Sequence, residues 1–477
     1  MFERLIVDAA ARYPRDPAMR LGLDLAPSFT TMANDVRRAA GWLKKAAIAP
    51  GARVVIHLKD AYLHWVLSFA CEARGIVFIP EAPSATLDAD RLAFLGACHV
   101  LSWTASPGIE GIGWSTIDRM WHLRLRTLRV VALPDRARAP DDPVCILLSS
   151  GTTGSAKKVL LTREAIDGRL GHVLAAYTGE RGRGLLCLVP VQSFTGFMSV
   201  LTGWGQARAI GVRLAGGSYA ALLATGWFDA IVAAPIHLAD VLTDLPEDAA
   251  PAAGLRLTTG GSPLGDALAA EVRRRLSPDL RMGYGTTEAG VVTRAPLISA
   301  DHHVGYAGIV LPWVEVEIVD GAGTPQPTGT SGEVRIRAAY MVDSYLDDPE
   351  ATRRCFRDGW YHPGDVGRLD AERGLTIEGR VDELINVGGR KVLPALVEAR
   401  VLALSGVAEA AAFAIHDAGD GPRLGIAVRG DASIDPTAVA GAIPEFPGAV
   451  VVRVEALPRN AMGKVERRVL ADRWRRP

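Results

Sequence analysis

The sequence lacks a net charge, a paired set of cysteines and a long apolar run. Its 53 basic and 53 acidic residues cancel over 477 residues, which favours neither nucleic acid nor an anionic membrane as a partner. The five cysteines are scattered without a C-x-x-C pair, so we predict reduced thiols and neither a disulfide frame nor a zinc site. No stretch approaches the ~18 apolar residues of a membrane helix, and the first residues lack the apolar core of a signal peptide. We therefore expect a cytoplasmic protein without a membrane span.

Lysine is also scarce, because only seven of the 53 basic residues are lysine. Arginine thus supplies almost all of the positive surface charge, and arginine and lysine are not interchangeable in function. Lys44 and Lys45 lie in a segment whose pattern is typical of a solvent-exposed helix. Lysines in glycine-rich segments, such as Lys157 and Lys464, are instead candidates for function.

The distribution of apolar residues and glycine divides the chain into parts. A chain of this length is too large for one core. Strand-length and helix-length segments alternate from residue 30 to about residue 300, which predicts parallel α/β sheets with ligand loops at the strand carboxyl ends. Alternating, glycine-punctuated stretches then predict antiparallel hairpins that form a small barrel-like part. We expect a large α/β domain over residues 1–381 and a small α+β domain over residues 382–477.

One segment suggests phosphate chemistry. CILLSSGTTGSAKKVLLT, residues 145–162, is an apolar strand that breaks into a loop of hydroxyl residues and glycines followed by two lysines. Backbone amides, hydroxyls and a cation in such a loop can surround an anion. The spacing differs from G-x-x-x-x-G-K-[ST], so this is not the common P-loop.

Further motifs follow in order along the chain. They are LRLTTGGSPLG (255–265), MGYGTTEAG (282–290), DGWYHPGDVGRLD (358–370), EGRVDELINVGGRKVLPALVE (378–398) and LPRNAMGKVERRVL (457–470). Together with the loop at residues 149–158, this ordered set resembles the ANL family of acyl-adenylate-forming enzymes, the AMP-dependent synthetases and ligases, which include acyl-CoA synthetases. The resemblance covers nearly the whole chain. It implies an AMP-forming acid–thiol ligase that converts a carboxylic acid and ATP to acyl-AMP and pyrophosphate, and then transfers the acyl group to a thiol.

The resemblance also implies an ATP site. It would comprise Ser150, Gly151, Thr152, Thr153, Gly154 and Lys157 around the β- and γ-phosphates, and Gly260, Gly261, Ser262, Tyr284, Gly285, Asp365 and Arg380 around the nucleoside. Tyr284 would lie against adenine. Asp365 would accept both ribose hydroxyls, a role that suits a carboxylate because it can accept two hydrogen bonds at once.

Three residues would act at the reacting atoms. The resemblance places Thr287 near the α-phosphate, Glu288 on Mg²⁺ and Lys464 on the acyl carboxylate and α-phosphate. Magnesium favours one or two carboxylates together with phosphate oxygens, and charge on the phosphate oxygens calls for preorganised donors and a metal. A rotation about Asp382 would then bring a thiol tunnel made by Gly388, Gly389 and Lys391 to the site.

Each assignment has a plainer alternative. Glu288 could be an acid that stabilises a helix N-terminus, and Asp365 could cap a turn. Asp382 could form a surface ion pair with Arg380. Lys464 could be a solvated lysine at the start of a helix, although a cation is unfavourable there.

The resemblance also implies that the acid substrate lies beside residues 188–205, LVPVQSFTGFMSVLTGWG, where amino-acid-activating relatives carry an aspartate. The candidate pocket residues are Ser193, Phe194, Thr195, Gly196, Phe197 and Gly283. The segment contains no aspartate to pair with an α-ammonium, and burying an unpaired ammonium is costly, so we expect an aryl or medium-chain acid and not a free amino acid. Phe197 and Met198 could equally be core residues.

The sequence departs from the family pattern in the phosphate loop and in the small domain. Ala156 and Lys158 stand where proline and glycine are usual, Pro363 replaces a common threonine, and Leu396 takes a usual acid position. None of these changes removes a catalytic group, but they put loop dynamics and the thiolation surface in question.

The acceptor thiol would come from outside, because no carrier domain follows Lys464 in this sequence. Coenzyme A is the first expectation. A separate acyl carrier protein, loaded by a stand-alone adenylation enzyme, is the alternative within the same class. A third possibility is a catalytically inactive protein that binds a nucleotide, and the presence of Glu288 and Lys464 argues against it.

Overall fold

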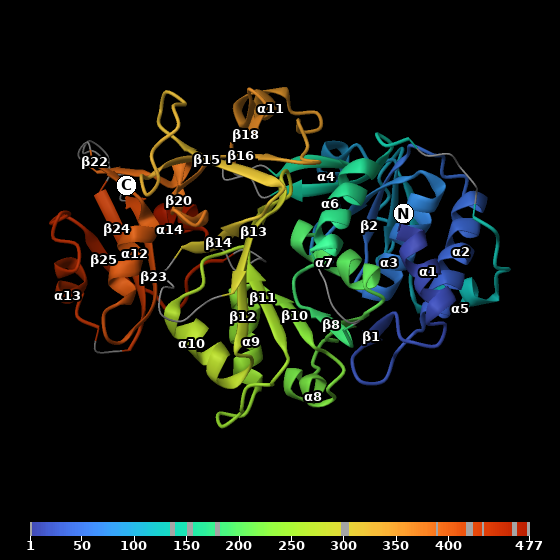
Figure 1. The fold of residues 1–477 in the computed structure, drawn as a ribbon. Coiled ribbons are helices and arrows are strands. Elements are labelled where there is room, and N and C mark those ends of the chain that lie inside the picture. The colour runs from blue at the N-terminus through green and yellow to red at the C-terminus, as the bar shows by residue number, and fades with distance from the viewer. Residues whose placement is uncertain are drawn as a thin grey trace.

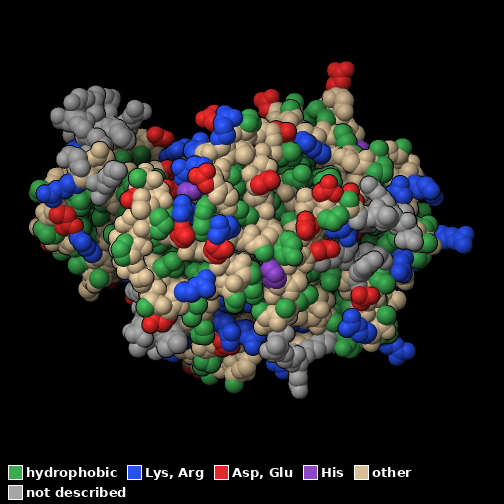
Figure 2. Space-filling model, turned by 45° about the horizontal axis from the view of Figure 1, so that its top comes forward, with side chains coloured by type: hydrophobic (Ala, Val, Ile, Leu, Met, Phe, Trp, Pro, Cys, Tyr) green, Lys and Arg blue, Asp and Glu red, His purple; other side chains and the backbone are tan. Residues whose placement is uncertain are grey.

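The computed structural model describes most of the chain, namely residues 2–133, 139–149, 156–176, 182–296, 305–387, 390–415, 423–431, 434–459 and 465–474. Figure 1 shows two sheet-and-helix regions side by side, with the C-terminal elements gathered at one end of the molecule. Figure 2 shows a face on which basic, acidic and apolar side chains are interspersed, in keeping with the balanced charge.

The first region is a six-stranded sheet in the order β5-β4-β2-β3-β6-β7. Its strands are β2 (Arg53–His57), β3 (Val77–Pro80), β4 (His99–Ser102), β5 (Gly113–Thr116), β6 (Pro143–Ser149) and β7 (Lys157–Thr162). The helices of this part of the chain are α1 (Phe2–Arg12), α2 (Phe29–Lys45), α3 (Ala61–Arg74), α4 (Ala89–Leu95), α5 (Arg119–Thr127) and α6 (Arg163–Ala175). The strands pair in parallel except for β6 and β7, which form an antiparallel hairpin.

Helix α3 illustrates why these segments fold as they do. The side chain of Asp60 caps its N-terminus by accepting a hydrogen bond from the Leu63 amide over 3.0 Å. Gly75 ends the helix in the left-handed conformation at φ 70°, which glycine adopts without a Cβ penalty. Most of the intervening side chains are buried, including Trp65 and Phe69. The helix therefore lies inside the core and not on the surface.

The second region is a 14-stranded sheet in which β1, β9, β8, β10, β11 and β12 are parallel neighbours. These strands are β1 (Met19–Leu21), β8 (Gly184–Cys187), β9 (Ala209–Val212), β10 (Ala230–Ala233), β11 (Arg256–Gly260) and β12 (Asp279–Thr286). The helices between them are α7 (Phe194–Gly205), α8 (Tyr219–Ala224), α9 (Pro235–Asp244) and α10 (Asp266–Arg275). Strand β8 lies between β9 and β10, so the chain leaves it in one direction and returns on its other side.

The predicted hairpins continue this same sheet as antiparallel strands. They are β13 (Gly290–Pro296), β14 (Tyr306–Val310), β15 (Val314–Val319), β16 (Gly332–Ala338), β17 (Phe356–Arg357), β18 (Trp360–Tyr361), β19 (Asp365–Leu369) and β20 (Gly374–Arg380), with helix α11 (Pro349–Cys355) before β17. The switch occurs at β12, which pairs in parallel with β11 and antiparallel with β13. The mixed α/β fold is confirmed, and its antiparallel part extends the central sheet.

The C-terminal elements have hydrophobic clusters of their own. They are the 3₁₀ turn η1 (Val381–Glu383), β21 (Ile385–Val387), β22 (Arg390–Val392), α12 (Pro394–Leu402), β23 (Val407–Ile415), β24 (Arg423–Gly430), α13 (Pro436–Gly441), β25 (Val450–Arg453) and α14 (Arg467–Arg473). Two clusters of buried side chains draw all of their members from residues after 384, with Val401, Phe413 and Ile426 among them. This arrangement agrees with the α+β unit expected there.

Candidate functional site

Glu288 lies in the tight turn between β12 and β13, where the sheet changes from parallel to antiparallel. Its side chain is 4% exposed, and its Oε1 accepts a hydrogen bond from the Tyr345 hydroxyl over 2.8 Å. The residue follows a strand, so the alternative of an acid at a helix N-terminus does not apply. Burial first, and then the Glu288 carboxylate, raise the pKa of Tyr345 well above its usual value, so the phenol keeps the proton that it donates.

Lys157 approaches the same tyrosine from β7, the edge strand of the six-stranded sheet. Its Nζ lies 4.8 Å from the centre of the Tyr345 ring, and it donates to Sγ of Cys355 over 3.6 Å. Lys157 begins β7 opposite Ser149, the last residue of β6. Ser150, Gly151, Thr152, Thr153 and Gly154 lie outside the described residues. Lys157 and Glu288 are therefore brought together around one aromatic side chain, although they are 131 positions apart in the chain.

Lys158, which replaces a usual glycine, has a structural contact. Its Nζ donates to the carbonyl of Phe94 over 2.7 Å and to Oδ2 of Asp347 over 2.8 Å. The hydrogen bond from Lys158 lowers the pKa of Asp347. This lysine thereby fixes the segment before α11 against the phosphate-loop hairpin, and the same segment carries Tyr345.

Asp365 and Arg380 face each other across two antiparallel strands. They are paired in register between β19 and β20, and Arg380 donates to Oδ1 of Asp365 over 2.8 Å. The hydroxyl of Tyr284, which ends the regular part of β12, donates to Oδ2 of the same aspartate. Asp365 is 5% exposed and opens a strand, so it is not a turn cap. Three of the residues assigned to the nucleoside thus form one hydrogen-bonded group.

The glycines assigned to the nucleotide lie at the carboxyl ends of β11 and β12. Gly260 and Gly283 are register partners, and a Cβ on Gly260 would lie 2.3 Å from the Gly283 carbonyl oxygen. Gly261 has φ 87°, which favours glycine. Ser262 follows it, and Gly285 lies at a register shift. A side chain at Gly260 or Gly285 would collide with the backbone of the neighbouring strand.

The expected acid pocket follows β8 at the point where the strand order reverses. In open α/β sheets, ligands bind in the crevice at such a switch point. Ser193 caps α7, because its Oγ accepts from the Gly196 amide over 3.1 Å and donates to the Pro190 carbonyl over 2.7 Å. Phe194 is 7% exposed and Thr195 is exposed.

Phe197 packs in the core beneath that pocket segment. Its ring stacks on Trp65 at a centroid distance of 5.6 Å, and it is 1% exposed, while Met198 is 4% exposed. Gly196 has no space for a side chain, since a Cβ there would lie 2.2 Å from the Pro190 carbonyl. Phe197 and Met198 are therefore buried in the core, as the alternative interpretation of these residues had it.

The family model for AMP-binding enzymes matches residues 6–346. The chain belongs to this family.

Similar proteins span most of this AMP-binding enzyme. A 4-coumarate–CoA ligase 2 of Oryza sativa subsp. japonica is 31% identical over 91% of this chain and 85% of its own length. The fatty acid–acyl-carrier-protein ligase ScoC of Streptomyces coeruleorubidus is 28% identical over 94% of this chain and 91% of its own. The AMP-binding enzyme is thus an AMP-forming acid–thiol ligase, which forms an acyl-adenylate and transfers the acyl group to a thiol.

Solved structures confirm the fold. ATP-bound MatB from Rhodopseudomonas palustris has a TM-score of 0.87 at 21% identity, over 99% of both chains. O-succinylbenzoate coenzyme A synthetase (MenE) from Bacillus subtilis, in complex with ATP and magnesium ion, has a TM-score of 0.81 at 20% identity, over 98% of both chains.

Sequence reasoning missed three residues that contact the assigned site of the AMP-binding enzyme. Tyr345 and Tyr361 share a side-chain hydrogen bond, and burial raises the pKa of Tyr361. Arg169 of α6 donates to the carbonyls of Thr287 and Glu288. A tyrosine directly before His362-Pro363-Gly364-Asp365 could have been noticed. Nothing in the α6 sequence distinguishes Arg169 from the other arginines.

The C-terminal assignments are only partly described. Gly388, Gly389 and Lys464 lie outside the described residues, as does the side chain of Lys391, whose backbone pairs with Asn386 between β21 and β22. Asp382 lies in η1 with its Oδ1 3.6 Å from Nε of Arg380. Within the described ranges, none of the helices has both the length and the apolar character that a membrane crossing needs.

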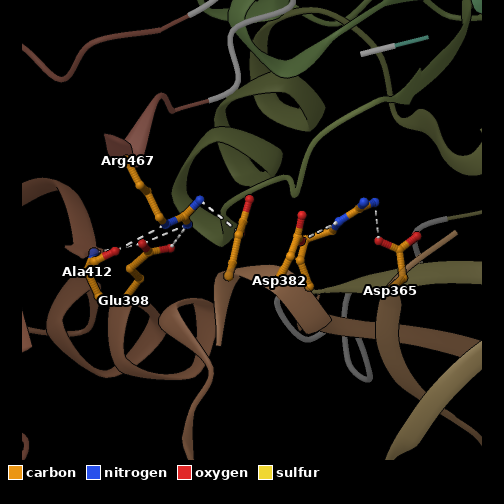
Figure 3. A network of polar contacts seen from close by, with 7 residues as sticks. Asp365, Asp382, Glu398, Ala412 and Arg467 are labelled. Carbon is orange, nitrogen blue, oxygen red and sulfur yellow. Dashed lines mark hydrogen bonds and ion pairs between the residues drawn. The ribbon is translucent and has the colours of Figure 1, made fainter. Parts of the chain in front are cut away.

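A polar network continues from Asp382 into the C-terminal elements (Figure 3). Arg467 of α14 donates to both carboxylate oxygens of Glu398 at 2.8 and 2.9 Å, to the Ala412 carbonyl over 3.1 Å and to Glu383 over 3.2 Å. Burial raises the pKa of Glu398, and Arg467 opposes that rise. The last helix is therefore tied to α12, β23 and η1.

Proposed function

We propose that this enzyme activates a non-amino carboxylic acid, of aryl or medium-chain type, and transfers it to coenzyme A. In the first step, a carboxylate oxygen of the acid bonds to the α-phosphorus of ATP, and the bond to the pyrophosphate oxygen breaks. In the second step, the thiol sulfur bonds to the acyl carbon, AMP leaves and the thiol proton is released. Charge develops on phosphate oxygens in the first step, so fixed cations and donors are the groups that should accelerate it.

The observation that carries the proposal is the position of Lys157 and Glu288 around Tyr345. A cation for phosphate oxygens and a buried carboxylate for a divalent ion come from different regions of the protein and meet at one aromatic ring. We assign Lys157 to the β- and γ-phosphates and Glu288 to the metal. The ribose is assigned to Asp365 and Arg380, with Tyr284 supporting the aspartate.

Glu288 suits Mg²⁺ that arrives with ATP. Within the described residues, no three His, Cys, Asp or Glu side chains come together as a metal site, and Mg²⁺ is commonly held by one or two carboxylates plus substrate phosphates. The ion would neutralise developing phosphate charge when bound. Tyr345 keeps the carboxylate oriented, and Arg169 holds the backbone of the same residue.

The expected substrate class follows from the charges near Phe194. The guanidinium carbon of Arg169 lies 5.3 Å from the centre of the Phe194 ring, and the pocket segment carries no acid. An α-ammonium placed there would meet a cation and no carboxylate partner, which is unfavourable. An uncharged aryl or alkyl group has no such cost.

Coenzyme A is proposed as the acceptor, with an acyl carrier protein as the alternative. Both occur among the similar proteins, as in the rice 4-coumarate–CoA ligase and ScoC. Gly389→Trp should block thioester formation from acyl-AMP while sparing pyrophosphate release, if Gly388 and Gly389 line the thiol path. Loss of both half-reactions would contradict the tunnel assignment, and much faster acylation of holo-carrier protein than of coenzyme A would favour the alternative acceptor.

We also propose Val381 and Asp382 as the pivot between residues 1–381 and 382–477. Arg380, on one side, is bound to Asp365, and Glu383, on the other, is bound to Arg467 of the last helix. Arg380 is thus bound to the large domain and Glu383 to the small one. A rotation of the small domain would therefore change the backbone dihedral angles of the two residues between these contacts.

A panel of carboxylic acids tests the function. Each acid is incubated with ATP, Mg²⁺ and coenzyme A, and pyrophosphate release is measured. We expect release with aryl or medium-chain acids and not with standard amino acids. Release driven best by an amino acid would contradict the pocket argument, and no release with any acid would favour an inactive nucleotide-binding protein.

A further inference from the structure

Arg169 is a buried cation whose hydrogen bonds go to backbone carbonyls. Its side chain comes from α6 and is 6% exposed. Its Nε donates to the carbonyl of Tyr340 over 2.9 Å. Its Nη1 donates to the carbonyl of Thr287 over 2.9 Å, and its Nη2 to that of Glu288 over 2.6 Å. One guanidinium therefore joins three segments that are remote in sequence.

Burying a guanidinium in this way is costly, because desolvation disfavours the charged form. Burial lowers the pKa of Arg169 to about 10, and the nearby charge of Glu288 counteracts part of that fall. No salt bridge joins Arg169 to a carboxylate among the residues that the structure describes. A residue kept at such a cost has to do something that an apolar side chain of the same size cannot do, and the planar fork of arginine can hold several carbonyls at once.

The segment on the other side of Arg169 is held in an unusual conformation. Tyr340 has φ 63°, a left-handed value that costs about 1–2 kcal/mol for a residue with a side chain. Two residues later, the Val342 amide donates to the Glu288 carbonyl over 3.0 Å. Arg169 and Val342 thus share one acceptor, and the strained turn is closed onto the Thr287–Glu288 backbone.

The same guanidinium also packs against the acid pocket, 5.3 Å from the centre of the Phe194 ring. Arg169 therefore contacts the pocket segment on one side and the Thr287–Glu288 turn on the other. In the proposed first step, the acyl carboxylate would meet the α-phosphate between these two groups. A misplacement of about 1 Å between reacting groups can cost ~10²-fold in rate.

We propose that Arg169 is a positioning residue for the adenylation step, which sets the distance between the acid pocket at Phe194 and the Thr287–Glu288 turn. This inference rests on the proposed function, in which Glu288 holds the metal. It assigns Arg169 no contact with ATP or acid. It also predicts that the second half-reaction, which starts from finished acyl-AMP, depends far less on this residue.

Arg169→Lys is the decisive variant, because it keeps the charge and loses the planar fork. With the best acid of the panel, we expect the kcat of pyrophosphate release to fall about 10-fold or more, which is less than the ~10²- to 10³-fold cost of removing a donor at the reacting atoms. The Mg²⁺ concentration for half-maximal rate should rise several-fold. Thioester formation from synthetic acyl-AMP and coenzyme A should stay within about two-fold of wild type. Arg169→Met should show the same split more strongly, and Arg169→Lys suffices if the methionine variant does not fold.

Arg275 offers a matched control. Its Nη2 likewise donates to three backbone carbonyls, those of Leu242, Leu245 and Pro246, but none of these belongs to the assigned site. Arg275→Lys should lower Tm about as much as Arg169→Lys and leave the Mg²⁺ dependence unchanged.

Two results for Arg169→Lys would overturn the proposal. They are an unchanged kcat and Mg²⁺ dependence, or an equal loss in both half-reactions that follows the change in Tm. A wild-type enzyme without acid-dependent pyrophosphate release would instead contradict the proposed function itself, so the two failures are distinguishable.

Discussion

The hydroxyl of Tyr345 donates a hydrogen bond to Oε1 of Glu288 over 2.8 Å, in a buried part of the protein. The ring of the same tyrosine lies beneath the ammonium of Lys157. One side chain therefore contacts both charged groups that we assign to the phosphates and their metal. The enzyme's use of ATP should depend on Tyr345 even though the residue is uncharged.

We predict that Tyr345→Phe lowers adenylation roughly 10- to 10²-fold, since removing one oriented donor from a charged group costs roughly 1.5–3 kcal/mol. The Mg²⁺ concentration for half-maximal pyrophosphate release should rise. Tyr62→Phe is the control, because the Tyr62 hydroxyl also donates to a buried carboxylate, that of Asp35 at 2.8 Å, outside the assigned site. An equal effect of both variants on Mg²⁺ dependence would contradict the prediction.

Lys464 is predicted to act only in the first half-reaction. Its role rests on the family resemblance, and a compact ammonium on a long stem suits contact with both the carboxylate and the α-phosphate. Lys464→Ala should reduce acid-dependent pyrophosphate release by roughly 10²- to 10³-fold, as expected for an electrostatic donor, while thioester formation from synthetic acyl-AMP stays near wild type. Lys464→Arg should not restore adenylation. If both half-reactions fell equally, the residue would be structural and the proposed domain rotation would lose its support.

His64 is predicted to make stability depend on pH. Burial lowers its pKa from 6.5 to about 4, so the folded state favours the neutral ring and the unfolded state binds the proton more tightly. The neutral His64 ring makes its full contribution to the free energy of unfolding above pH 6.5, and this contribution is lost as pH falls towards 4. The free energy of unfolding should therefore be about 2 kcal/mol lower at pH 5 than at pH 7. Urea unfolding at pH 7 and pH 5 should show a smaller difference for His64→Gln than for wild type. Identical differences would mean that His64 is not protonated on unfolding.

Local sequence signals predicted the helices and strands around the site more successfully than they predicted the side-chain contacts within it. Gly75 ends α3 with a left-handed C-cap, which is a property of one residue and its neighbours and can therefore be predicted locally. The parallel strands were predicted from apolar periodicity, whereas the pocket segment was assigned from the family resemblance. These features depend on interactions close in sequence or on simple packing of layers.

Other residues could not be assigned in this way because their partners are remote. Ser193 was expected to line the acid pocket, and its hydroxyl caps α7. Arg169 contacts residues 118 and 119 positions away, and Lys158 contacts Asp347. The sequence of α6 alone does not show which arginine faces inward, since the choice is made by the backbone carbonyls that meet it in the folded protein.

The most direct test of the account is exchange of labelled pyrophosphate into ATP in the absence of any thiol, measured for wild type and Glu288→Gln. Exchange requires reversible acyl-AMP formation and does not depend on the identity of the acceptor. We predict exchange by wild type that requires both the acid and Mg²⁺, and a loss of about 10²-fold or more in Glu288→Gln if this carboxylate holds the metal. Wild-type exchange without acid would contradict reversible acyl-AMP formation, and a near-wild-type rate for Glu288→Gln would contradict the assignment of Glu288 to the metal that accompanies ATP.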